Sequence, residues 1–197
     1  ADVRLRSLPT APGTASVSRS GPTSTDADGR FVFNGVTPGR YVVMVSRDGY
    51  VSNRADNFRL RGELLSVAPG QHVNDIVVRL LPDGAIAGHL INEAGKPLRD
   101  VSVLAMKSSY PHGRRELQDV AHAVTNDAGE YRIESLAPGK YYIRTKLPAS
   151  LKAKPGSEKA YVPIYYPAAG DQARSVALVL RAGEELVGID MTLIPVH

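Results

Sequence analysis

The chain has 197 residues, of which 43% are hydrophobic and 22% charged, with a net charge of +4 at pH 7. This length allows two domains of about 100 residues, each with its own core. No apolar run approaches the roughly 18 residues that a membrane-spanning helix needs. The mild charge favours an ordinary surface with scattered Lys and Arg over a nucleic-acid-binding one. Cysteine is absent, so disulfides and thiolate metal sites are excluded.

The first eight residues predict a strand. In residues 1–8, Val3 and Leu5 alternate with arginines, which is the period of a half-buried strand. Residues 9–24 are rich in Pro, Gly, Ser and Thr and predict a loop.

The next stretch occurs twice, one hundred positions apart. Residues 25–45 read TDADGRFVFNGVTPGRYVVMV, and residues 125–145 read TNDAGEYRIESLAPGKYYIRT. Each copy has a polar turn ending in Gly, an alternating strand, a Pro-Gly pair and a second alternating strand. Proline and glycine suit the two central positions of a type II turn, so each copy predicts a β-hairpin.

A second element also recurs, after a Gly at position 70 and again after one at position 183. The recurring apolar residues are Ile76, Val78 and Leu80 in the first copy and Ile189, Met191 and Leu193 in the second. The chain is therefore expected to contain two copies of one β module. The breaker at residues 81–84 separates them, which predicts domains over residues 1–81 and 82–197.

The two modules differ at their beginnings. In the second, an alternating segment at residues 85–91 and a turn at residues 92–97 precede the strand that starts near Asp100. Nothing precedes the matching strand at residues 1–8. The first module is expected to lack its opening strand.

The second module also carries two long insertions, residues 108–121 and 146–171. Loops of this length in a compact domain are usually either functional or mobile. No segment has a convincing helical period, although residues 116–123 could form one short turn.

The repeated pattern D-x-x-G-x-[FY]-x-[FI]-x-x-[VL]-x-P-G-x-Y resembles the carboxypeptidase regulatory-like domains of bacteria, which belong with the prealbumin-like and Cna B-type β-sandwiches. The matching residues are Gly29, Phe31, Phe33, Val36, Pro38, Gly39 and Tyr41 in the first copy and Gly129, Tyr131, Ile133, Leu136, Pro138, Gly139 and Tyr141 in the second. The resemblance implies an all-β chain of two tandem Greek-key, prealbumin-like (Ig-like) sandwiches. It also implies a secreted or cell-surface location in a bacterium.

Some Cna B-type relatives carry an internal Lys–Asn or Lys–Asp isopeptide bond. Residues 85–91 contain no Lys, and Asp190 alternates with core residues so that its side chain is expected to face outward. No isopeptide bond is expected here.

Asp26 and Asp28 are the weak candidates for a metal site. Alternate carboxylates before a Gly resemble half of a calcium loop, but no further acid follows at the right spacing, and the alternative is that they cap the turn at Gly29. The five histidines are far apart, and no nucleophile, zinc or phosphate motif is present. The sequence predicts neither a cofactor nor an enzyme.

Tyr161, Tyr165 and Tyr166 lie in a proline-containing loop and could stack on sugar rings or on a partner surface. The alternative, which the family resemblance favours, is that they pack on the edge of their own sandwich.

Two functions follow as hypotheses. A module that lacks a strand exposes a sheet edge and part of its core, and a strand from a neighbouring subunit could fill the gap. The first hypothesis is therefore a structural or adhesion module that assembles with copies of itself into a filament or another surface assembly, with Val3 and Leu5 as candidate contacts. The alternative is that the sequence is a fragment cut from a longer chain, or that the first module is a smaller sandwich that is stable without this strand. Neither alternative requires assembly. The second hypothesis is a polysaccharide-binding accessory module of a larger secreted or outer-membrane protein.

Overall fold

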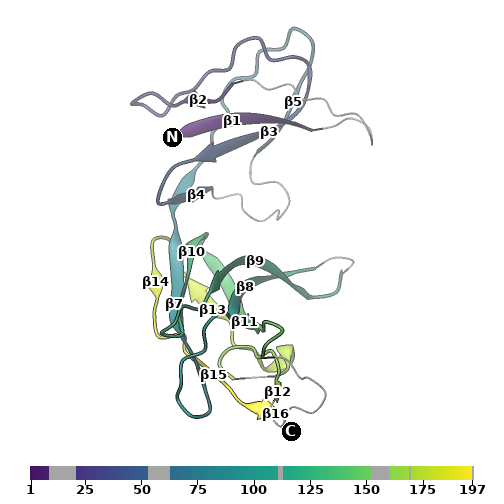
Figure 1. The fold of residues 1–197 in the computed structure, drawn as a ribbon. Helices are drawn as coiled ribbons and strands as arrows, with labels where there is room; N and C mark the ends of the chain where they lie inside the picture. Colours follow the sequence, from purple (N-terminus) through teal and green to yellow (C-terminus); the bar gives the residue numbers. More distant parts are fainter. Residues whose placement is uncertain (9–20, 53–62, 111–112, 152–159, 169, 197) are drawn as a thin grey trace. The chain divides into compact units, whose positions relative to one another are not determined.

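The computed structural model describes residues 1–8, 21–52, 63–110, 113–151, 160–168 and 170–196. It divides into two compact units, Ala1–Pro82 (unit 1) and Asp83–His197 (unit 2). The regular elements are almost entirely β-strands (Figure 1), which confirms the predicted all-β class. In the described part of the chain, no helix is long and apolar enough to cross a membrane.

Unit 1 contains one antiparallel sheet of four strands in the order β2-β1-β3-β5. These strands are β1 (Asp2–Leu8), β2 (Thr23–Ser24), β3 (Gly39–Ser46) and β5 (Glu63–Val67). A separate pair joins β4 (Tyr50–Ser52) to β6 (Leu80–Pro82). Val3, Leu5, Tyr41 and Val43 alternate along β1 and β3 and form the buried core of the sheet.

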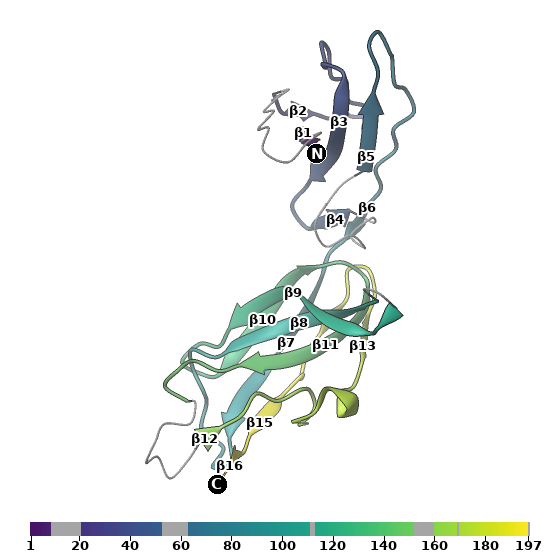
Figure 2. The same ribbon diagram turned by 90° about the vertical axis from the view of Figure 1, so that its right-hand side faces the viewer.

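Unit 2 repeats this sheet in the order β13-β11-β8-β9 (Figure 2). Its strands are β8 (Ser102–Ser109), β9 (Glu116–Val124), β11 (Gly139–Lys146) and β13 (Leu178–Leu180). Each corresponds to one strand of unit 1, with β8 in the place of β1 and β11 in the place of β3.

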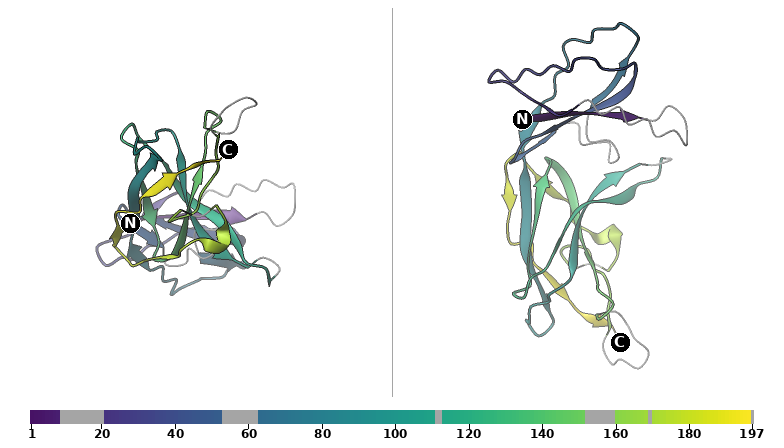
Figure 3. Two further views of the ribbon diagram at one scale, coloured as in Figure 1. Left: turned by 90° about the horizontal axis from the view of Figure 1, so that it is seen from below. Right: turned by 45° about the horizontal axis from the view of Figure 1, so that its top comes forward.

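A second sheet completes unit 2, and β7 (Gly84–Asn92) lies at its centre. On one edge β7 pairs antiparallel with β10 (Glu130–Leu136), and on the other it pairs parallel with β14 (Glu185–Leu186) and β15 (Met191–Leu193). The right-hand view of Figure 3 shows β7 between the green β10 and the yellow β14. Sixteen buried side chains between the two sheets form the core of this sandwich.

Two predicted details are wrong. The repeated segments are not hairpins, because β10 pairs with β7 while β11 pairs with β8 and β13 in the other sheet. The Pro-Gly pair therefore connects two layers. The left-handed residues of this connection are Gly35 (φ 67°) and Ser135 (φ 56°), whereas Gly139 has a φ of 153° and begins a strand.

Residues 108–121 are also not simply a loop, because Glu116–Val124 forms β9 and pairs along β8. A bulge between Ala105 and Met106 shifts the register of this pairing. Such a bulge interrupts the period of two from which a strand is predicted. Of the second insertion, Ala160–Tyr161 forms β12, which pairs with β16 (Pro195–Val196), and residues 152–159 lie outside the described residues.

Candidate functional site

The central strand of unit 2 is hydrogen-bonded along both of its edges. Beyond the ladder pairs, the Leu90 N–H donates to Gly129 O at 2.8 Å, and the Ile189 N–H donates to Ala87 O at 3.1 Å. Ile86 and Leu90 are fully buried and face the opposite sheet. Among the described strands, β10, β14 and β15 pair in this sheet with β7 alone, so each would lose its partner without β7.

Unit 1 has both neighbours of this strand but no counterpart of the strand itself in the described residues. Residues 30–36 correspond to β10, and residues 71–79 correspond to the stretch that holds β14 and β15. Their backbones turn at the same places, because Gly35 matches Ser135 and Asp75 (φ 63°) matches Gly188 (φ 74°). We call residues 30–36 and 71–79 the acceptor segments.

The acceptor segments are not paired with any strand within the described ranges, and no strand is formed over their length. Backbone N–H and C=O groups that do not bond within a protein must be satisfied by water or by another chain. Together the two segments offer the two unpaired edges between which unit 2 holds β7.

Burial differs accordingly between matching residues. In unit 2 the apolar side chains beside β7 are at most 7% exposed: Tyr131, Ile133, Leu136, Ile189 and Met191. Their counterparts contact the core of unit 1 but are only partly buried: Phe31, Phe33, Val36, Ile76 and Val78. The same apolar positions are therefore buried in unit 2 and only partly buried in unit 1.

A matched pair of glycines shows where the opening lies. A Cβ on Gly129 would lie 2.5 Å from Leu90 O and 3.0 Å from Pro97 Cβ, because β7 and the following turn cover it. Gly29 has nearly the same φ (79° against 74°), yet no described atom lies within 4 Å of the equivalent Cβ position. No described residue of unit 1 takes the place that the Leu90 carbonyl has in unit 2.

Each acceptor segment exposes one large apolar side chain among polar ones such as Asn34 and Asn74. Val32 and Val77 are 67% and 66% exposed. Their counterparts in unit 2 are the charged residues Arg132 and Asp190.

Residues 2–78, which include both acceptor segments except for the last residue, match the family model of the carboxypeptidase regulatory-like domain. Unit 1 matches this domain family over almost its whole length. The matched residues end before unit 2, and unit 2 is related to unit 1 by the internal repeat.

Among solved structures, the chain is similar to a minor pilin of Streptococcus agalactiae, with 15% identity and a TM-score of 0.40 over 100% of this chain and 83% of that one. A streptococcal ancillary pilin has 18% identity and a TM-score of 0.37 over 99% and 57% of the two chains. Phospholipase PlaB from Legionella pneumophila has 14% identity and a TM-score of 0.38 over 62% and 28%. No curated protein matches the chain. These weak likenesses carry no argument about function.

The predicted contact residues Val3 and Leu5 lie in the core of the regulatory-like domain. They are 0% and 7% exposed on the inner face of β1, in one cluster with the half-buried Phe31 and Phe33. An added strand would meet them through that cluster, so their role as partner contacts stays a prediction.

Asp26 is used within its own turn. Its Oδ1 accepts the N–H groups of Asp28 (3.0 Å) and Arg30 (2.8 Å), and an Asp28 carboxylate oxygen lies 3.6 Å from the Arg30 guanidinium. Asn126 Oδ1 accepts the two equivalent N–H groups in unit 2. The described residues contain no group of three or more His, Asp or Glu that could hold a metal ion. The capping alternative accounts for this geometry.

The three predicted tyrosines do not form one exposed surface. Tyr165 is 9% exposed and packs with Leu104 and Met106, and the Arg144 guanidinium lies 5.4 Å from its ring centroid. The Tyr166 N–H donates to Ile143 O, so this segment lies along β11. Tyr161 donates to Glu93 Oε2 at 3.0 Å, and it and Tyr166 are partly buried. The alternative prediction, that the tyrosines pack on their own sandwich, agrees with the position of Tyr165.

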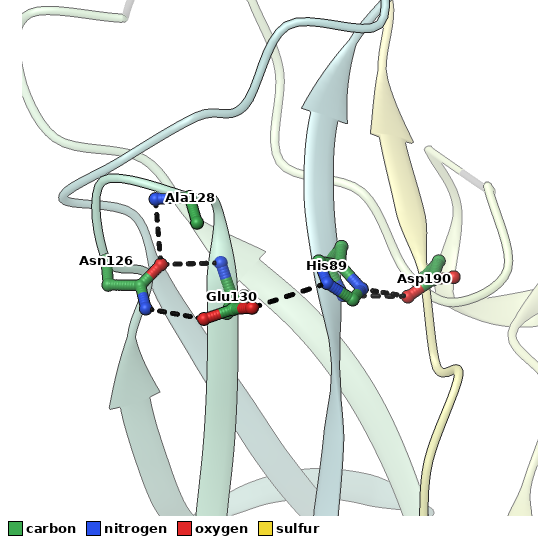
Figure 4. A network of polar contacts seen from close by, with 5 residues as sticks. All are labelled: His89, Asn126, Ala128, Glu130 and Asp190. Carbon is green, nitrogen blue, oxygen red and sulfur yellow. Dashed lines mark hydrogen bonds and ion pairs between the residues drawn. The ribbon is translucent and has the colours of Figure 1, made fainter.

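Sequence reasoning missed a polar network on the outer side of β7 (Figure 4). His89 Nδ1 lies 3.1 Å from Asp190 Oδ1, which also accepts the His89 N–H, and His89 Nε2 lies 3.8 Å from Glu130 Oε1. All three side chains are more than half exposed. These residues are far apart in the sequence, and only the pairing of β7 with its neighbours brings them together. The network joins β7 to both of its neighbours through side chains as well as through the backbone.

Proposed function

We propose that this chain is a non-enzymatic structural or adhesion module of a secreted or cell-surface bacterial assembly. In this proposal, unit 1 binds a neighbouring subunit by accepting one of its β-strands between the acceptor segments. The observation that carries the proposal is the match between these segments and the two edges that hold β7 in unit 2. Strand addition of this kind uses main-chain hydrogen bonds for affinity and alternate side chains for specificity.

The free energy that burial of the acceptor side chains contributes covers only part of the cost of association. Fully burying an exposed Val, Ile or Phe side chain contributes about 1.5–3 kcal/mol, so completing five half-buried ones contributes roughly 5 kcal/mol. The loss of translational and rotational freedom costs about 4–15 kcal/mol. The acceptor side alone therefore does not set the affinity, and the residues of the added strand must contribute as much again.

The geometry also bears on the form of the assembly. The surface that accepts a strand differs from the one that donates it, so each contact is heterologous. Repeated heterologous contacts that do not close on themselves produce a filament.

The test compares the chain with a Gly29→Asn variant by sedimentation velocity over a range of concentrations and by electron microscopy. Asn tolerates a positive φ, so this variant is expected to fold, but its side chain would lie where the carbonyl of an added strand belongs. Concentration-dependent assemblies in the parent chain, reduced in the variant, are expected. A parent chain that stays monomeric at every concentration would overturn the proposal.

Polysaccharide binding is the second proposal, and the observation in its favour is that Tyr161 and Tyr166 retain part of their exposure. It is the weaker one, because the Tyr165 ring is covered. Retention on immobilised polysaccharides that is lost in a Tyr161→Ala, Tyr166→Ala double variant would support it. Equal retention of both chains would exclude the tyrosines as a binding surface.

A further inference from the structure

We propose that unit 2 binds an acidic polysaccharide, one whose sugars carry carboxylates, on the outer side of its sheet β13-β11-β8-β9. The binding residues, which we call the cationic face, are Arg115, Lys140, Arg144 and Lys146. This inference rests on the proposed function only for the secreted or cell-surface location. It concerns a different surface from the acceptor segments and from the tyrosines of the second proposal.

The alternation of β11 places three of these cations on one side of the sheet. The core-facing residues of this strand are at most 1% exposed, and they are Tyr141, Ile143 and Thr145. Successive side chains of a strand point to opposite faces, and those on the same face recur about every 7 Å. The outward positions of β11 are therefore a row that consists of Lys140, Tyr142, Arg144 and Lys146.

Two guanidinium groups of the cationic face lie over tyrosine rings. The Arg144 guanidinium carbon is 5.4 Å from the centroid of Tyr165, and that of Arg115 is 4.8 Å from the centroid of Tyr142. Arg115 Nε also donates to Ser108 Oγ at 3.1 Å. A cation over the face of an aromatic ring is attracted by the ring. The rings therefore hold both guanidinium groups in place without neutralising their charge.

The charge of the cationic face is not balanced by acids. None of its four residues forms an ion pair with a described residue. On the strands of this side the ladder places one acid, Asp119, which lies opposite Met106 at the edge strand β9. On the outer side of the other sheet, by contrast, Arg132 is paired with both Glu134 and Glu185. Cations without acids are free to meet an external anion.

The charges are a property of unit 2 and not of the shared fold. Strand β3 takes the place of β11 in unit 1, and its outward positions hold Arg40, Val42, Met44 and Ser46. Only the first of these is charged. The sheet therefore forms without the charges of Arg144 and Lys146, which indicates that they have another role.

The apolar part of this side is covered, which restricts the class of ligand. Leu104, Met106 and Tyr165 form one cluster there and are at most 9% exposed. The exposed large apolar side chains of these strands are Val124 and Val179, on the two outermost strands. A protein partner would lack the apolar centre that interfaces bury, and single-stranded nucleic acid would lack open rings for its bases.

The accessible groups are those that recognise a polyanion. Arginine binds carboxylates through two parallel N–H donors, whereas lysine acts as a point charge. A row of such groups along an extended strand suits an extended polymer with an anionic group on each repeat unit. For a secreted or cell-surface protein this polymer is assigned to an acidic polysaccharide.

The experiment measures binding of the full chain to sodium polygalacturonate by isothermal titration calorimetry at low and at physiological salt. The control ligand is the fully methyl-esterified polymer, which has the same backbone without the charges. Binding to the acid that weakens with salt, and no binding to the ester, are expected because the contacts are ionic. No binding to the acid, or equal binding to the ester, would overturn the inference.

A first pair of variants tests the lysines. Lys140→Gln with Lys146→Gln is expected to weaken binding roughly 10-fold, since each exposed ion pair contributes up to about a factor of five. Both side chains are exposed, so this variant is expected to fold. The matched control, Arg99→Gln with Arg132→Gln, removes the same charge from residues that are paired with acids. An equal loss in the control would mean that binding follows net charge, and the cationic face would be excluded.

A second variant tests the stacked arginines. Arg115→Gln with Arg144→Gln is expected to weaken binding at least as much as the lysine variant, because glutamine keeps a polar side chain but loses the paired donors. Unchanged binding in this variant would show that the stacked guanidinium groups are not part of the site and would overturn the assignment.

Other polyanions and the other proposals give distinct outcomes. Duplex DNA or phosphatidylglycerol vesicles that bind as tightly as polygalacturonate would assign the cationic face to that partner instead. Gly29→Asn is expected to bind polygalacturonate as the parent does. A chain that binds but never assembles would contradict the proposed assembly alone, and a chain that assembles but does not bind would contradict this inference alone. Loss of binding in Tyr161→Ala with Tyr166→Ala, but not in the cationic variants, would transfer the site to the tyrosines.

Discussion

Units 1 and 2 share one sheet and differ in the other. The sheets β2-β1-β3-β5 and β9-β8-β11-β13 match strand for strand, and in each unit a tyrosine hydroxyl donates to the carbonyl four residues earlier, Tyr41 to Thr37 and Tyr141 to Ala137. Within the part of the chain that the structure describes, only unit 2 has a strand between the two segments that cover this sheet. The comparison shows which properties of a segment depend on an adjacent strand and which do not. The turns of the acceptor segments persist without a partner strand, whereas the burial and the ladder do not.

The sharpest way to break this comparison uses its matched glycines. Gly129→Asn is expected to lower the free energy of unfolding of unit 2 by about 3 kcal/mol or more, because its Cβ would overlap the Leu90 carbonyl. Gly29→Asn is expected to cost unit 1 less than about 1 kcal/mol, since Asn tolerates the left-handed conformation.

Hydrogen exchange in denaturant, read separately from the amides of β1 and β3 and from those of β8 and β11, measures the two effects. Each variant serves as the control of the other. Equal losses in the two units would mean that the Gly29 position is enclosed, and that unit 1 has no open strand position.

A second pair compares the apolar side chains next to the missing strand. Ile133→Ala is expected to destabilise unit 2 by about 3 kcal/mol, because Ile133 is 1% exposed and its removal leaves a cavity. Phe33→Ala is expected to cost unit 1 about 1 kcal/mol, well below the 3–5 kcal/mol of a buried Phe, because Phe33 is only partly buried.

The same exchange experiment, repeated with an added peptide that has the sequence of residues 84–96, sharpens this second pair. Phe33 is then enclosed, so the cost of Phe33→Ala is expected to rise toward that of Ile133→Ala. If bound peptide leaves the cost unchanged, the peptide does not cover Phe33.

A third comparison is chemical and concerns Tyr131, which is Phe31 in unit 1. The Tyr131 hydroxyl donates to Ile189 O at 2.5 Å in the core of unit 2. Tyr131→Phe is expected to destabilise unit 2 by about 1–2 kcal/mol, because it leaves the buried carbonyl without its donor.

The same tyrosine makes unit 2 sensitive to alkali. Burial raises the pKa of Tyr141 from 10.0 to about 12 and raises the pKa of Tyr131 further, with a contribution from Asp190. The folded state holds these protons more tightly than the unfolded state, so their contribution is complete below pH 10 and is lost as the pH rises from about 10 toward 12 and above. Denaturant unfolding of unit 2 at stepped pH is expected to show this loss, reduced in Tyr131→Phe. A slope that is unchanged in the variant would assign the loss to other groups.

The sequence predicts the shared part of the two units better than the site. Alternation and the internal repeat are enough to predict the strands, because alternation is a local property. The expectation that the first module lacks its opening strand stays a prediction. Pairing is not local: the pattern around Pro38 and Pro138 is the same for a hairpin and for a connection between sheets. The register shift between Ala105 and Met106 interrupts the alternation of β9 along β8, so a period of two does not predict this strand. The network of His89, Glu130 and Asp190 depends on which strands are neighbours, so no spacing in the sequence could have indicated it.

The smallest expected effect is one that should be equal in the two units. Asp26 and Asn126 each accept two backbone N–H groups in the turn before the acceptor segment and before β10, respectively. Replacing either residue by Ala is expected to cost its own unit about 1 kcal/mol, because two turn N–H groups lose their partner. Neither cost should depend on the added strand, since the turn closes on itself. Addition of calcium is expected to leave the stability of unit 1 unchanged, as a capping role for Asp26 requires. A stabilisation by calcium that disappears in Asp26→Ala would instead assign a metal to this turn and would make it, and not the missing strand, the main difference between the two repeats.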